Sequence, residues 1–198
     1  MKRKIFGRLV PVIAGILILS GIGLAAEFSA DMMQSSGKTV NKGKLYVKSG
    51  KVRQEITSGM KQIVIVRPDK KLVWMLDPVA KTYMKVTGKV IRGLDDPGAR
   101  ARIKEIGTAK PISKETVNGY LCEKRQWVTK GVPRTTVTEW VSRQLGFALK
   151  TEMKDPSSKK VIEYKNIKVG RISDSLFEIP RGYRSLAVPV QPKKAPGK

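Results

Sequence analysis

The chain has 198 residues, with 40 Lys and Arg against 16 Asp and Glu, one Cys and no His. The lack of His excludes Ser-His-Asp and Cys-His catalysis, and a single Cys without His leaves no zinc site of the usual ligand types. The sequence therefore predicts a protein that is not an enzyme, and no catalytic residue, metal ligand or cofactor is assigned.

The first 26 residues have the layout of an export signal. Four basic residues precede an apolar run at 9–19, and small residues follow at 23–26. A cleaved signal peptide predicts a periplasmic protein. The alternative is a membrane anchor formed by the uncleaved leader, because residues 9–26 carry no charge and have about the minimum length for a membrane span. Four of the 40 basic residues lie in the leader, so the remainder has 36 basic against 16 acidic residues, a net charge of +20.

Residues 27–186 are predicted to form a single β-rich domain. Runs rich in Val, Ile, Thr, Tyr and Trp alternate with short turn signals, at 49–50, 58–59, 77–78, 130–131 and 155–158. These connections are too short for helical crossovers, so neighbouring strands are expected to pair as antiparallel hairpins in a meander.

The pattern within the runs indicates which faces are buried. Residues 63–66 and 72–76 are apolar at both odd and even positions, so both faces of each strand are apolar. This pattern is typical of a strand covered on both sides. The run at 147–154 alternates instead, with Phe147, Leu149 and Met153 on one face and charged residues on the other. The first half of the sheet therefore needs a cover on its second side.

Three other segments have individual interpretations. Residues 95–106 predict a short helix that supplies this cover, because Asp96 suits an N-cap and Pro97 suits a first helical turn. Cys122 is interpreted as a small buried residue in a strand rather than as a reactive thiol. Residues 187–198 contain three Pro and three Lys, which predicts a flexible basic tail.

Large apolar side chains in the strands are the candidates for lining a ligand cavity. Residues of this kind form either an ordinary core or the wall of an apolar site, and the sequence leaves both interpretations open. The candidates are Trp74, Leu76, Tyr83, Trp127, Trp140, Phe147, Leu149 and Met153.

Several stretches resemble exported relatives of the LolA/LolB lipoprotein-localisation superfamily. In the first half these are FSADMM, GKLYVKSGKVRQEI and IVIVRPDKKLVWMLDPVAKTYMKV. In the second half they are ETVNGYLCEKRQWV, TEWVSRQLGFALKTEM and DSLFEIPRGYRSL, the last resembling the terminal strand of such domains. Together they reach from Phe28 to Leu186.

The resemblance implies a mainly β fold with minor α, in which an unclosed antiparallel half-barrel holds an apolar cavity and a short helical plug lies at its open side. LolA carries acylated lipoproteins across the periplasm and LolB receives them. The resemblance therefore implies a domain of unknown function that acts as a non-enzymatic carrier or sensor, with a lipid or lipoprotein acyl chain as its partner.

The net charge supports an alternative function. A strongly basic chain is attracted to anionic surfaces, so the alternative is an envelope interaction module that binds anionic lipid or polymer. No specific nucleic-acid partner is predicted, and the oligomeric state is left open.

Overall fold

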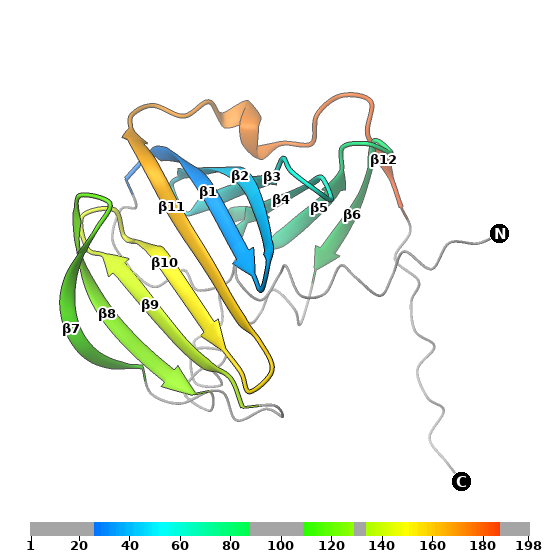
Figure 1. Cartoon of the computed structure of the whole chain (residues 1–198). Coiled ribbons are helices and arrows are strands. Elements are labelled where there is room, and N and C mark those ends of the chain that lie inside the picture. Colours follow the sequence, from blue (N-terminus) through cyan, green and yellow to red (C-terminus); the bar gives the residue numbers. More distant parts are fainter. Residues whose placement is uncertain (1–25, 88–108, 129–133, 187–198) are drawn as a thin grey trace, which may run out of the picture.

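The computed structural model describes residues 26–87, 109–128 and 134–186 (Figure 1). The predicted leader up to residue 25, the predicted helix at 95–106 and the predicted tail at 187–198 lie outside these ranges. Among the described residues, no helix has the length and apolar character needed to cross a membrane.

Two runs of consecutive strands make up the sheet. The first run is β1 (Phe28–Ser36), β2 (Thr39–Lys48), β3 (Lys51–Ile56), β4 (Gln62–Arg67), β5 (Leu72–Asp77) and β6 (Thr82–Thr87), with the 3-10 turn η1 (Pro68–Lys70) between β4 and β5. The second run is β7 (Lys110–Val117), β8 (Tyr120–Val128), β9 (Thr136–Ser142), β10 (Phe147–Lys154) and β11 (Lys159–Val169). The 3-10 helix η2 (Asp174–Phe177) and the short strand β12 (Arg184–Ser185) follow.

All the strands belong to one unclosed sheet with the order β12-β6-β5-β4-β3-β2-β1-β11-β10-β9-β8-β7. The predicted antiparallel half-barrel is confirmed, and every pairing is antiparallel except that of β12 with β6. The structure is not the simple meander that was predicted, because β1 also pairs with β11 and this pairing joins the two runs of strands. The register of the pair extends from Phe28 opposite Val169 to Ser36 opposite Lys160.

The predicted turn at 49–50 and a turn at 118–119 that was not predicted have the same chemistry. The β2–β3 turn consists of Ser49 and Gly50, with φ of 48° and 76°, and the β7–β8 turn consists of Asn118 and Gly119, with φ of 50° and 85°. Positive φ at both central residues is the conformation that matches the twist of a two-residue hairpin. Short polar residues and glycine at these positions therefore set the register of the hairpins.

Contacts across the sheet show that it is strongly curved. Gln54 on β3 donates a hydrogen bond from Nε2 to the hydroxyl of Tyr164 on β11, although β2 and β1 lie between these strands. Three strand spacings cover about 14 Å in a flat sheet, too far for two side chains that stand perpendicular to it. The face that carries Gln54 and Tyr164 is therefore the concave face.

Residues 172–183, here called the strap, cover the opposite, convex face of β3 and β4 and lead to β12 (Figure 1). Phe177 is fully buried beneath the strap. Buried arginines of the sheet bind the strap backbone: Arg53 Nη1 donates to the Leu176 carbonyl at 2.8 Å, and Arg67 Nη1 donates to the Phe177 carbonyl at 2.9 Å.

The strap corrects one expectation from the sequence. The segment that resembles a terminal strand forms η2 and irregular backbone instead, and only Arg184 and Ser185 pair with β6. The physical reason is that Phe177 and its neighbours bury their side chains on the face of the sheet, whereas a terminal strand would have to extend its edge. The strap also covers one face of β4, a strand that is apolar on both faces, whereas the helix predicted as a cover at 95–106 lies outside the described residues.

We expect Arg67→Met to lower the free energy of unfolding by about 2 kcal/mol, because the variant leaves the Phe177 carbonyl buried without its donor. Lys70→Met is the control, since Lys70 and Arg67 both form an ion pair with Glu178, but the Lys70 side chain is 43% exposed. The expected loss for Lys70→Met stays within about 0.5 kcal/mol. Urea unfolding measures both. Equal losses would show that the buried carbonyl contact does not hold the strap.

Candidate functional site on the concave face

The concave face of β1–β5 is almost entirely apolar. Its side chains alternate with those of the convex face, and the pairings of β1 with β2, β2 with β3 and β3 with β4 keep them in register. The buried apolar members on these strands are Phe28, Ala30, Met32, Leu45, Val47, Val52, Val64, Val66, Val73 and Met75. These side chains pack against one another in the core of the domain, and their attraction to apolar groups is non-directional.

Three aromatic rings connect the two halves of this face. The ring of Phe147 on β10 lies edge-on to Phe28 on β1, with centroids 5.7 Å apart, and edge-on to Tyr164 on β11 at 5.6 Å. Edge-to-face contact is a favoured geometry for aromatic pairs. The predicted alternation in β10 holds only in part, because Phe147 and Leu149 are buried as expected, but Ala148 is buried as well and a β-bulge lies between Ala148 and Lys150.

A few polar groups interrupt the apolar lining. Burial raises the pKa of the Tyr164 hydroxyl well above its usual range, so the hydroxyl stays protonated while it accepts the hydrogen bond from Gln54. Arg125 on β8 and Glu139 on β9 form an ion pair at 3.3 Å, and Glu139 is fully buried. A site of this kind has few polar groups at fixed positions, which is typical of pockets for amphiphilic molecules.

The structure does not bring the eight predicted lining residues together on one surface. Strand register places Trp127 and Met153 on the concave face, where Phe147 and the fully buried Leu149 join the core. The residues on the convex face are Trp74, Leu76, Tyr83 and Trp140.

Sequence reasoning missed Phe28, Gln54 and Tyr164. A signal for Gln54 was present, because it alternates with Val52 and Ile56 and so lies on the apolar face of its strand. A polar residue at such a position is expected to have a buried hydrogen-bond partner.

On the convex face, Trp140 belongs to a polar cluster in which each group has a partner. The ammonium groups of Lys150 and Lys124 both contact its ring, at 4.7 and 5.1 Å from the ring centroid. Glu115 accepts hydrogen bonds from Lys124 Nζ at 2.8 Å and from the indole N–H of Trp140 at 2.6 Å. These two bonds lower the pKa of Glu115 to about 2. The cluster fastens β7, β8, β9 and β10 together.

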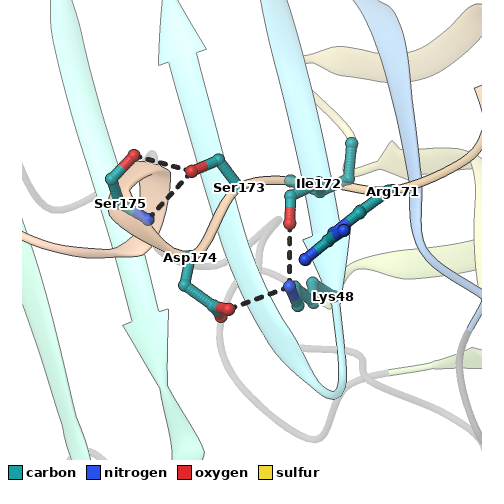
Figure 2. A pocket seen from close by; sticks show the side chains of 6 residues that line it. All are labelled: Lys48, Arg171, Ile172, Ser173, Asp174 and Ser175. Carbon is teal, nitrogen blue, oxygen red and sulfur yellow. Dashed lines mark hydrogen bonds and ion pairs between the residues drawn. The ribbon is translucent and has the colours of Figure 1, made fainter.

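An open pocket of about 550 Å³ lies where the strap begins (Figure 2). Lys48 Nζ donates to the Ile172 carbonyl at 2.8 Å and to Asp174 at 2.9 Å, so its charge is already balanced within the protein. Hydrogen bonds from Lys51 and Lys48 lower the pKa of Asp174 to about 2. The polar groups of this pocket therefore hold the strap in place. No predicted lining residue is among the six that border it: Lys48, Arg171, Ile172, Ser173, Asp174 and Ser175.

Cys122 is fully buried, as predicted, and burial raises the pKa of its thiol. In the described ranges, no group of three His, Cys, Asp or Glu residues has an arrangement that would hold a metal ion.

A family profile described as "Domain of unknown function (DUF4412)" matches residues 28–146, from β1 to the turn after β9. The chain belongs to this family. The unclosed antiparallel sheet has the LolA-like architecture that the sequence motifs predicted, and the matched family is one of unknown function. A comparison with curated proteins gives no match.

Solved structures similar to the DUF4412 chain come from several bacteria. An uncharacterized conserved protein from Thermus thermophilus is 10% identical, with a TM-score of 0.59 over 88% of this chain and 98% of that chain. The complex of Pseudomonas aeruginosa MucA and MucB contains a chain that is 11% identical, with a TM-score of 0.54 over 78% of this chain and 56% of that chain. The DUF4412 chain thus spans little more than half of the second relative, and both likenesses concern the fold alone. A LolA superfamily protein from Nitrosomonas europaea is 13% identical, with a TM-score of 0.37 over 83% of this chain and 96% of that chain.

Proposed function

We propose that this domain is an exported, non-enzymatic carrier or sensor that binds an acyl chain or a similar apolar ligand on the concave face of its sheet. The observation that carries the proposal is the chemistry of that face, where a continuous apolar surface contains the Gln54–Tyr164 hydrogen bond and the Arg125–Glu139 ion pair. The apolar surface would bind the chain of the ligand, and the polar groups would orient its head.

The sensor role has support from a relative. MucB, which shares the fold at 11% identity, has been solved in complex with MucA(peri). A protein of this architecture therefore binds a protein partner, and the domain described here would couple ligand binding to a partner in the envelope. Periplasmic location is part of the proposal and rests on the leader sequence.

Titration of the full chain with a fluorescent fatty acid tests the proposal. We expect one probe to bind per folded chain, and we expect binding to persist at 1 M salt because burial of apolar surface is not screened. Attraction between exposed charges is largely lost there, since the Debye length is about 3 Å. Binding that disappears at high salt, or folded protein that binds no probe, would contradict the proposal; in the second case the concave face is an ordinary core.

Two tryptophans distinguish the faces. We expect Trp127→Leu to weaken salt-resistant binding by about tenfold, because Trp127 shares the concave face and a lost aromatic contact of this size costs about 1.4 kcal/mol. Trp140→Leu changes the same residue type on the convex face and is expected to leave the affinity within about twofold. Both variants are titrated at a temperature below their cooperative unfolding transitions, so that each is folded during the measurement. If Trp140→Leu weakened binding more than Trp127→Leu, the ligand would bind on the convex face, which would contradict the proposal.

A further inference from the structure

We infer that the strand ends beside β12 form a docking surface for an anionic lipid bilayer. This surface, here called the rim patch, comes from the β3–β4 turn, the β5–β6 turn and the segment at β12. Its members are Met60, Lys61, Val79, Lys81, Arg184 and Leu186. The inference is independent of the concave-face proposal, because none of these side chains is among the residues assigned to that site.

The sheet brings the members of the rim patch into one strip. β4 pairs with β5 from Ile63 and Leu76 onward, so Lys61 lies beside the β5–β6 turn. The Arg184 amide then donates to the Lys81 carbonyl at 2.9 Å, and the Leu186 amide donates to the Tyr83 carbonyl at 2.7 Å. β4, β5, β6 and β12 are consecutive in the sheet, so the strip is about 14 Å wide.

Three large apolar side chains project from this strip into solvent. Val79 is 75% exposed, Met60 59% and Leu186 47%. The turn that presents Val79 is well fixed, because Asp77 accepts hydrogen bonds from the amides of Val79 at 2.8 Å and Ala80 at 2.9 Å. The protein therefore holds an exposed apolar residue at a turn tip in a defined conformation.

The basic members of the rim patch have no ion-pair partner among the residues that the structure describes. Within the described ranges no salt bridge involves Lys61, Lys81 or Arg184. At the opposite ends of β3 and β4, in contrast, Lys51 is paired with Asp174 and Lys70 with Glu178. Asp77 is the acidic residue within the strip, so three positive charges face one negative charge.

The mixture of groups identifies the partner as a bilayer rather than a soluble polyanion. A polyanion neutralises lysine and arginine but gives Met60, Val79 and Leu186 no apolar medium to enter. The interface of an anionic bilayer accepts both, because apolar side chains enter the boundary between headgroups and acyl chains while cations contact the lipid phosphates. Each group alone binds weakly, and the combination in one strip supplies the affinity.

Sedimentation of the full chain with vesicles tests the inference. We expect binding to vesicles of phosphatidylglycerol mixed with phosphatidylcholine and much weaker binding to phosphatidylcholine alone. The double variant Lys61→Glu/Lys81→Glu should weaken binding to the anionic vesicles by at least about tenfold. The matched control is Lys110→Glu/Lys114→Glu, which makes the same charge change at exposed positions on β7, at the far end of the sheet. This control should lose less than about threefold.

The apolar members are tested by Met60→Ser/Val79→Ser, which keeps every charge. We expect weaker binding to anionic vesicles by about fivefold and unchanged binding to dextran sulfate, a soluble polyanion. Equal losses in the two charge-reversed variants, or no binding of the wild type to anionic vesicles, would overturn the inference. Vesicle binding that is unaffected by Met60→Ser/Val79→Ser would overturn it in favour of a polyanion surface. Thermal unfolding confirms that each variant is folded.

Discussion

Gly43→Ala is expected to lower the free energy of unfolding by about 3 kcal/mol, at the upper end of what overpacking costs. Gly43 lies on β2 opposite Met32 and Ile56. A Cβ at this position would be 1.9 Å from the Glu55 carbonyl oxygen and 2.7 Å from the Met32 terminal methyl. The methyl group can rotate away, but the carbonyl belongs to the backbone of β3, so the two strands would have to separate.

Gly170→Ala is the matched control for this variant. A Cβ added at position 170 would have no atom within 4 Å, and the φ of this residue lies outside the left-handed region, so we expect a change within about 0.5 kcal/mol. Guanidinium unfolding followed by circular dichroism compares the two variants. Similar midpoints would show that β2 and β3 are not closely packed at Gly43.

Phe147→Asp is expected to cost several kcal/mol or to abolish folding, because it places an unpaired carboxylate within the apolar core. Phe147 is 7% exposed and contacts both Phe28 and Tyr164. Loss of this ring would also disconnect the aromatic contacts that join the two halves of the concave face. The measurement is the denaturation midpoint, or the absence of a cooperative transition.

Lys150→Glu provides the comparison on the other face of the same strand. Lys150 is half-buried, and its ammonium group lies over the Trp140 ring, so the variant loses a cation–π contact and gains a negative charge opposite Glu163. We expect a loss of about 1 kcal/mol, well below that of Phe147→Asp. Equal losses would contradict the assignment of faces in β10.

Local patterns predicted the strands well because each depends on its own residues. The alternation at Phe147–Lys154 indicated the buried face of β10, and the doubly apolar runs at 63–66 and 72–76 indicated strands covered on both sides. The two-residue turns likewise depend on residues that are adjacent in the chain. Sheet membership and open curvature then followed from the resemblance and from the short connections.

Relations between distant strands were not predictable in the same way. Trp74 and Phe147 are both large aromatic residues in strands, yet the first lies on the convex face and the second on the concave face, because a face is defined only by the order and register of all intervening strands. The β-bulge between Ala148 and Lys150 changes this register again. The strap depends on contacts such as that between Arg67 and Phe177, 110 residues apart, for which a single sequence contains no periodic signal.

The strap also determines when folding can finish. Because the partner of Arg67 is a carbonyl 110 residues further along the chain, and β1 pairs with β11, the N-terminal strands cannot complete their contacts while the chain is still being made. Long-range pairings of this kind fold slowly. A chain that passes through a narrow channel with its N-terminus first would therefore stay incompletely folded until most of it had crossed. The strap would then complete the domain on the far side.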